Sequence, residues 1–294
     1  MRDTGPGIAA STGAVTAAAV GLRKAVIPVG LGDDSLQPAS HAVPLEMLPV
    51  VDKPLVQYAV EEALACGFDE LIFVTQQGLA IVEDHFARGT EEEGAAAARV
   101  IGRPSAWGPA GRPRQVVICR QGDSQGLGHA LWTARNLIGE EAFAVLVPSD
   151  MLLGEKPAMS QLIDHYRTLT GNVVAVADNG LCEREGSFAA IAAGSAGRYI
   201  LQPDIFPALE RQQGLDIRQA ILSMTEVWPS RALAFAGRHF DCRSPEGLLE
   251  AQIAFALDRG DLAGHMDDVL ARYGNGRNTG TGISRAANAW QSGD

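Results

Sequence analysis

The sequence predicts a doubly wound α/β fold, in which helices cover both faces of a mainly parallel sheet. Apolar runs of strand length recur along the chain, and they alternate with segments whose apolar residues repeat at helical spacing. Strands buried on both faces have continuous apolar runs, and strands that alternate with helices form parallel sheets. With 294 residues, the chain can bury such a core without disulfides or a structural metal.

The expected elements follow one another along the chain. Short apolar runs such as VVAVA predict strands at residues 22–29, 71–74, 115–119, 143–147 and 173–177. Helical periodicity predicts helices at residues 54–66, 129–137 and 159–169. After residue 177 the alternation weakens, and we expect short strands at 189–193 and 198–201 and helices at 216–224 and 245–257. Residues 88–111 interrupt the pattern, and we expect a short surface helix and a loop there.

The ends of the chain differ in composition from its body. Residues 1–21 are rich in Ala, Gly and Thr and have no continuous apolar run, so they read as a flexible extension rather than a secretory signal. Residues 274–294 are rich in Gly, Asn and Ser, a composition typical of a flexible tail. The sequence therefore predicts one folded domain over residues 22–273.

Composition excludes several classes of function. The chain has 35 acidic and 24 basic side chains, a formal net charge of −11, which argues against nucleic-acid and membrane-surface partners. No stretch approaches the roughly 20 apolar residues that a membrane span needs. The cysteines are scattered without a C-x-x-C pair, so we expect reduced thiols in a cytoplasmic protein and no zinc site: Cys66, Cys119, Cys182 and Cys242.

The loop after the first strand is a candidate for nucleotide binding. In an open parallel sheet, ligands bind beyond the carboxyl ends of the strands. Gly30 and Gly32 would let a phosphate approach the backbone closely. Glycine also occurs in ordinary turns, and Asp33 and Asp34 would repel a triphosphate unless a cation intervenes.

A second glycine-rich loop follows the strand at 115–119. Gly126 and Gly128 would allow another close approach of a ligand to the backbone, and Gln121 can offer both a donor and an acceptor to a base edge. His129 opens the next helix, where a capping or packing role is more common than catalysis.

Two carboxylates could bind a metal ion. Asp150 follows the strand at 143–147, where a carboxylate can hold Mg²⁺ near phosphates or, together with Ser149, cap a helix. Asp241 ends a late strand and could be a second ligand of the same ion, although a surface aspartate is the commoner case. The residues alone leave both alternatives open.

The chain resembles the bacterial UTP–glucose-1-phosphate uridylyltransferase (UDP-glucose pyrophosphorylase) family. The segments that carry the resemblance are KAVIPV at 24–29, PLEMLPVVDKPLVQYAVEEALACG at 44–67, RQGDSQGLGHAL at 120–131, GRYILQPDIF at 197–206 and GRHFDC at 237–242. The resemblance implies a Rossmann-like catalytic domain, Mg²⁺ as cofactor, homo-oligomers, and UTP, glucose 1-phosphate and UDP-glucose as ligands. In the implied reaction, glucose 1-phosphate attacks the α-phosphorus of UTP and releases pyrophosphate.

The resemblance also implies site residues. Those expected at the nucleotide are Gly30, Gly32, Glu46, Gln121, Gly126 and Gly128. We expect Lys53 and Asp150 to be catalytic, with Asp150 and Asp241 as metal ligands, and Arg198 is an alternative to Lys53 for holding phosphate.

Several positions depart from the family pattern. Ser35 stands where the family has an arginine, Leu45 where it has a lysine, Ser149 where it has an aspartate, and Arg243 where it has the glycine of D-C-G. The segment 177–197 is short and lacks the family's V-E-K-P motif; the residues 155–157 (EKP) lie in a different context.

Two hypotheses follow from these departures. Losing a cationic clamp on phosphate can cost roughly 10³-fold or more in turnover. The first is therefore a uridylyltransferase whose turnover is weak or lost. The alternative is a non-catalytic paralogue that binds nucleotide or sugar nucleotide and associates with an active relative.

Overall fold

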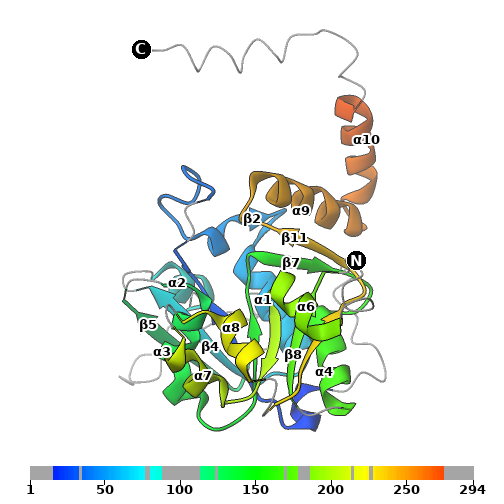
Figure 1. Ribbon diagram of the computed structural model, residues 1–294. Helices are drawn as coiled ribbons and strands as arrows, with labels where there is room; N and C mark the ends of the chain where they lie inside the picture. The colour runs from blue at the N-terminus through cyan, green and yellow to red at the C-terminus, as the bar shows by residue number, and fades with distance from the viewer. Residues whose placement is uncertain are drawn as a thin grey trace.

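The computed structural model describes residues 16–32, 35–76, 80–87, 113–122, 125–168, 171–177, 186–212, 215–224 and 228–274. Its centre is a seven-stranded sheet with helices around it (Figure 1). The strands of this sheet, in spatial order, are β10 (Ser230–Ala234), β8 (Asn172–Val176), β9 (Arg198–Leu201), β6 (Phe143–Leu146), β1 (Lys24–Pro28), β4 (Glu70–Gln76) and β5 (Gln115–Gln121). Only β9 runs antiparallel to its neighbours, so the predicted mainly parallel sheet is confirmed.

Helices pack on both faces of this sheet, as predicted for a doubly wound fold. One apolar cluster joins the sheet to α1 (Leu55–Ala65), α2 (Ile81–Ala87) and α4 (Ala158–Thr168). The cluster on the opposite face contains residues of α3 (Leu127–Ile138), α6 (Gly186–Ala193), α7 (Ile205–Arg211) and α8 (Ile217–Ser223). Burying apolar surface on both sides explains why the strands read as unbroken apolar runs.

Short elements beside the central sheet carry much of the candidate site. They form two small antiparallel sheets and one 3-10 helix: β2 (Pro49–Val50) with β3 (Lys53–Pro54), β7 (Asp150–Leu153) with β11 (Arg238–Asp241), and η2 (Leu45–Met47). A third apolar cluster packs these elements against α9 (Pro245–Asp258). The last described helix, α10 (Ala263–Gly274), follows α9 and extends away from the body in Figure 1.

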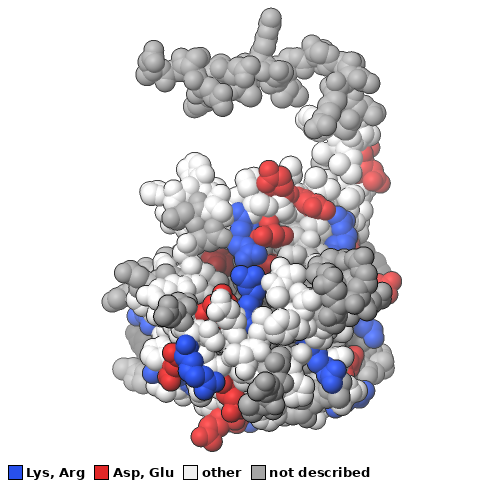
Figure 2. Space-filling view, in the orientation of Figure 1, with Lys and Arg blue, Asp and Glu red and all other residues white. Residues whose placement is uncertain are grey.

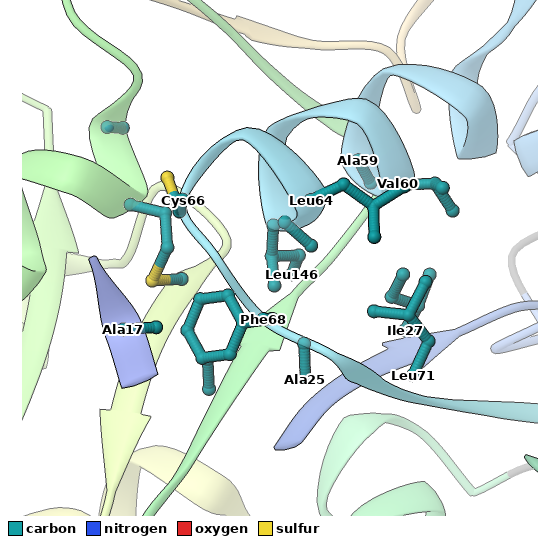
Figure 3. Packing of buried hydrophobic residues seen from close by; sticks show 14 of the residues in the cluster. Ala17, Ala25, Ile27, Ala59, Val60, Leu64, Cys66, Phe68, Leu71 and Leu146 are labelled. Atoms are coloured by element: carbon teal, nitrogen blue, oxygen red, sulfur yellow. The ribbon is translucent and has the colours of Figure 1, made fainter. Parts of the chain in front are cut away.

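The segment 16–21, which the sequence assigned to the N-terminal extension, packs on the domain. It contains a 3-10 helix, η1 (Ala17–Val20). Ala17 is fully buried, and its backbone N–H donates to the carbonyl of Cys66 at 2.8 Å. Figure 3 shows Ala17 beside the ring of Phe68.

One expected strand is wrong. Residues 189–193 form the end of helix α6, because alanine is the strongest helix former and the segment AAIAA has no β-branched run. The expected strand at 198–201 is confirmed as β9. The segment 88–111 and the tail beyond residue 274 lie outside the described residues. In the described part of the chain, no helix is long and apolar enough to cross a membrane.

Candidate nucleotide site and carboxylate pair

The carboxyl ends of β1, β4 and β5 meet at one edge of the sheet. These three strands are parallel neighbours, with Val74 of β4 opposite Pro28 of β1 and Gln76 of β4 opposite Gln121 of β5. The loop after β1 and the loop after β5 therefore leave the sheet from the same edge. This brings the two glycine-rich segments to a common region, as the sequence predicted.

A buried glutamate holds the first loop. Gly30 follows β1, and its N–H donates to Oε2 of Glu46 at 3.0 Å. Glu46 lies in η2 and is only 3% exposed. Gly30 and Gly32 have φ of 72° and 80°, in the region that strongly favours glycine. Glu46 therefore acts on the backbone of the loop, while Asp33 and Asp34 lie outside the described residues.

Gln121 presents an unpaired donor at the end of β5. Its side chain is 2% exposed, and Oε1 lies 3.2 Å from Nδ1 of His129. Its amide nitrogen Nε2 is buried and has no hydrogen-bond partner within the described part of the protein. A buried N–H without a partner costs about 1–3 kcal/mol, so this atom is suited to a ligand that brings an acceptor. His129 serves here to orient the amide of Gln121.

The two glycines of the second loop have different surroundings. Gly126 has φ of 89°, and a Cβ there would meet no atom of the described residues within 4 Å. A Cβ on Gly128 would lie 1.7 Å from the carbonyl oxygen of Leu215. Gly128 thus permits the close packing of α3 on the segment before α8, and its contact with nucleotide stays a prediction.

Asp150 and Asp241 lie directly opposite one another. They are paired in the antiparallel register of β7 and β11, so their side chains project from the same face. Arg243 contacts both carboxylates: its Nε is 2.6 Å from Oδ1 of Asp241, and its Nη2 is 3.3 Å from Oδ1 of Asp150. His239 donates from Nε2 to the same oxygen of Asp150 at 2.7 Å.

These contacts affect protonation. Burial alone would raise the pKa of Asp241, but the hydrogen bonds and charge of Arg243 outweigh it and hold that pKa below its usual value. Burial, together with the charges of Asp150 and Asp241, raises the pKa of the neighbouring Cys242 to about 12. Cys242 packs in the third apolar cluster, so it is a protonated core thiol rather than a nucleophile.

Neither candidate phosphate cation lies free in the structure. Lys53 pairs with Glu61, with Nζ 2.7 Å from Oε2, and its ammonium lies 4.8 Å from the ring centre of Tyr58. Its role at phosphate stays a prediction. Arg198 is the wrong residue for that role, because it is buried and pairs with the buried Glu62 at 2.8 Å.

Sequence reasoning missed His239 and Arg243, which complete the carboxylate site. The available signal was their spacing, two residues before and two residues after Asp241. Residue i−2 of a strand projects from the same face as residue i, and a turn residue at i+2 can fold back onto it. The pairing with Asp150 required the register of β7 and β11.

This sequence is similar to those of known proteins. The profile of the Nucleotidyl transferase family matches residues 25–213. The UTP–glucose-1-phosphate uridylyltransferase 1 of Staphylococcus saprophyticus is 34% identical to this chain over 273 residues, which cover 80% of the chain and 93% of that relative. The chain belongs to the UTP–glucose-1-phosphate uridylyltransferase family. The enzyme of the same name from Bacillus subtilis is 32% identical over 278 residues, covering 82% of this chain and 93% of its own length.

Solved uridylyltransferase-family structures share the fold. A UDP-glucose pyrophosphorylase from Acinetobacter baumannii superposes with a TM-score of 0.69 and 25% identity, covering 85% of this chain and 99% of its own. A UDP-glucose pyrophosphorylase complexed with UDP-glucose gives a TM-score of 0.67 and 28% identity, covering 81% of this chain and all of its own. The predicted family and its Rossmann-like nucleotidyltransferase fold are confirmed.

The metal that the uridylyltransferase family implies does not fit the carboxylate pair as it stands. Mg²⁺ binds carboxylate oxygens at about 2.0–2.1 Å and usually retains several waters. Here Oδ1 of Asp150 and Oδ1 of Asp241 already accept from the guanidinium of Arg243. Among the described residues, no group of three or more His, Cys, Asp or Glu side chains could hold a metal ion.

Proposed function

We propose that this protein binds UTP and UDP-glucose at the edge of the sheet formed by β1, β4 and β5, and that its uridylyltransferase turnover is weak or absent. The observation that carries the binding is the buried Nε2 of Gln121, which has no hydrogen-bond partner within the described residues. Uracil has carbonyl oxygens that can accept from such an amide. The related UDP-glucose pyrophosphorylase that is complexed with UDP-glucose, 28% identical to this chain, supports the ligand class.

The backbone supplies the rest of the proposed nucleotide site. Gly30 and Gly32 follow β1 in left-handed conformations, which opens the loop to a phosphate. Glu46 fixes the first of these glycines through its N–H. The base and the phosphates of one nucleotide would then contact the loops that follow β5 and β1, which leave the sheet at the same edge.

The chemistry explains why turnover is proposed to be weak. Attack of a sugar phosphate on the α-phosphorus of UTP requires in-line positioning and neutralisation of the transferring phosphates. Ser35 and Leu45 provide no charge at two positions where the family pattern has cations. The described residues pair Lys53 with Glu61 and Arg198 with Glu62. Each of these cations is already neutralised by a carboxylate of the protein itself.

The non-catalytic alternative has one observation in its favour. Asp150 and Asp241, the predicted metal ligands, hold the protein's own Arg243. A chain that binds sugar nucleotide without converting it could act by associating with an active relative, and the oligomeric state stays a prediction. The two candidates share the nucleotide site and differ only in turnover.

Pyrophosphate release with UTP, glucose 1-phosphate and Mg²⁺ tests turnover, on protein freed of host enzyme. A rate in the ordinary enzymatic range of ~1–10³ s⁻¹ would overturn weak turnover. Calorimetric titration with UDP-glucose tests binding separately. We expect Gln121→Met to weaken binding about tenfold or more, because the amide loses its ligand contact.

Gln202→Met is the matched control for that variant. Gln202 is also a buried glutamine, but its Nε2 donates to Tyr166 and to the carbonyl of Gly171. It follows antiparallel β9 at the amino ends of the parallel strands, whereas Gln121 lies at their carboxyl ends. The control should lower stability and leave UDP-glucose affinity unchanged. Equal affinities for wild type and Gln121→Met would disprove the proposed nucleotide site.

A further inference from the structure

The carboxylate pair of Asp150 and Asp241 is occupied by a cation that belongs to the chain. The register of β7 and β11 places the two residues opposite each other. Arg243 follows in the turn after β11 and reaches back with two different nitrogens, Nε to Asp241 and Nη2 to Asp150. Its backbone N–H also donates to Oδ1 of Asp241, at 3.1 Å. One arginine therefore bridges both acids.

The surroundings of Asp150 leave little room for a hydrated ion. Asp150 is only 3% exposed. On one side, Oδ1 accepts from His239 and Arg243. On the other side lies Gly197, where a Cβ would stand 2.7 Å from Oδ2 and 2.4 Å from the Cβ of Asp150. Only a glycine, with φ of 67°, allows this approach. A metal ion that keeps several waters would have to displace the guanidinium.

The cation is connected to the first loop. Oγ of Ser35 donates to the carbonyl of Arg243, across 208 positions of sequence. The third apolar cluster packs the same region together through Leu36, Leu45 and Cys242. Positions 35 and 243, where this sequence differs from the family pattern, are thus in direct contact. Figure 2 shows a strip of Lys and Arg atoms on this face beside Asp and Glu atoms, although the whole chain is acidic.

We propose that Arg243 is the resident cation of this site: its guanidinium occupies the Asp150–Asp241 pair in place of a divalent metal ion. The pair is then a metal site masked by the chain itself. A guanidinium is permanently charged and matches carboxylates with directed donors, so it can neutralise both acids without an ion from solution. As a consequence that rests on the proposed function, binding of UDP-glucose should not require a divalent cation.

Titration with Mn²⁺ in the absence of nucleotide, followed by the loss of the free-ion paramagnetic resonance signal, tests the proposal. Wild type should bind Mn²⁺ weakly at this site. Arg243→Ala should bind it at least tenfold more tightly, because two adjacent carboxylates are then left without a cation. Adding Asp241→Asn to Arg243→Ala should abolish the gain, and Arg243→Lys, which keeps the charge, should resemble wild type.

Arg238→Ala is the matched control. Arg238 lies on β11, the strand that ends at Asp241; it is exposed and pairs with Glu250. Its removal should therefore leave Mn²⁺ affinity unchanged. If wild type and Arg243→Ala bind Mn²⁺ equally, whether tightly or not at all, the proposal is wrong. Arg243→Gln replaces Arg243→Ala if near-ultraviolet circular dichroism shows that the alanine variant is misfolded. Because no nucleotide is present, this result is independent of whether the protein binds UDP-glucose.

Discussion

Arg198 should be the most important single side chain for the stability of the site's framework. Its guanidinium pairs with Glu62 through Nε at 2.9 Å and Nη2 at 2.8 Å, and both residues are buried. Nη1 donates to the carbonyls of Val147, Asp150 and Gly197 at 2.9, 3.1 and 3.2 Å. One side chain on β9 thus ties α1 to the backbone that presents Asp150.

The expected cost of Arg198→Met follows from these contacts. Removing one partner of a buried ion pair leaves the other charge uncompensated and costs about 3–5 kcal/mol. For a domain of this size, about 2–4 °C of melting temperature is lost per kcal/mol, which gives ~6–20 °C. Urea denaturation followed by circular dichroism measures the free energy of unfolding, and a thermal scan measures the melting temperature.

A second variant separates charge burial from packing. Adding Glu62→Gln to Arg198→Met removes the stranded carboxylate while retaining an oxygen for the N–H of Met159, which Glu62 accepts at 2.9 Å. The double variant should therefore be more stable than Arg198→Met alone. Arg238→Met is the exposed control: its partner Glu250 is 58% exposed, and such pairs contribute about 0–1 kcal/mol. If Arg198→Met costs no more than Arg238→Met, or if the double variant is the less stable one, the reasoning fails.

Three other predictions concern single positions. Gly128→Ala places a Cβ 1.7 Å from the carbonyl oxygen of Leu215, so we expect a loss of about 1–3 kcal/mol in the free energy of unfolding, measured by urea denaturation; an unchanged free energy of unfolding would refute this packing role. The Cβ of Gly126→Ala meets no atom of the described residues within 4 Å, but alanine must adopt φ of 89°, so the variant should lose about 1–2 kcal/mol in the free energy of unfolding. It should also weaken UDP-glucose binding in calorimetry, and unchanged affinity would argue against nucleotide at that loop. Burial lowers the pKa of His85 below its usual 6.5, so the native state favours the neutral ring. The contribution of neutral His85 to the free energy of unfolding is therefore present above pH 6.5 and is lost as the pH falls from 6.5 through the lower native pKa. His85→Gln should make the urea midpoint less dependent on pH between pH 7.5 and 5.5.

The central sheet could be predicted from the sequence because burial on both faces leaves an unmistakable pattern. β6 and β8 are fully buried runs of apolar residues, apart from Asn172, and each was expected within one or two residues of its bounds. β10 was missed because its sequence, SRALA, is neither strongly apolar nor β-branched. α6 was mistaken for a strand because a short apolar run does not reveal its period.

The candidate site was predictable residue by residue but not as an arrangement. Gln121 and Asp150 were identified from their places after strands, which local sequence determines. The contact of Arg243 with Asp150 depends on pairing two strands whose opposed residues Asp150 and Asp241 are far apart in the chain. This long-range strand register is set by the packing of the third apolar cluster. Neither strand has a local sequence pattern that indicates which strand it pairs with.

The same arrangement changes how the departures from the family pattern at positions 35 and 243 should be interpreted. Judged position by position, Ser35 removes a cation from the first loop and Arg243 adds one after Asp241. In space the two residues touch, so the changes concern one small region whose charge is redistributed. Asp150 and Asp241 hold an arginine, so they do not add an unbalanced negative charge beside a nucleotide. The formal charge of −11 thus says little about the field at the site, which is set by which acids are paired and with what. The proposed weak turnover would follow from the cation that occupies these two carboxylates, and the Arg243 variants test that occupancy directly.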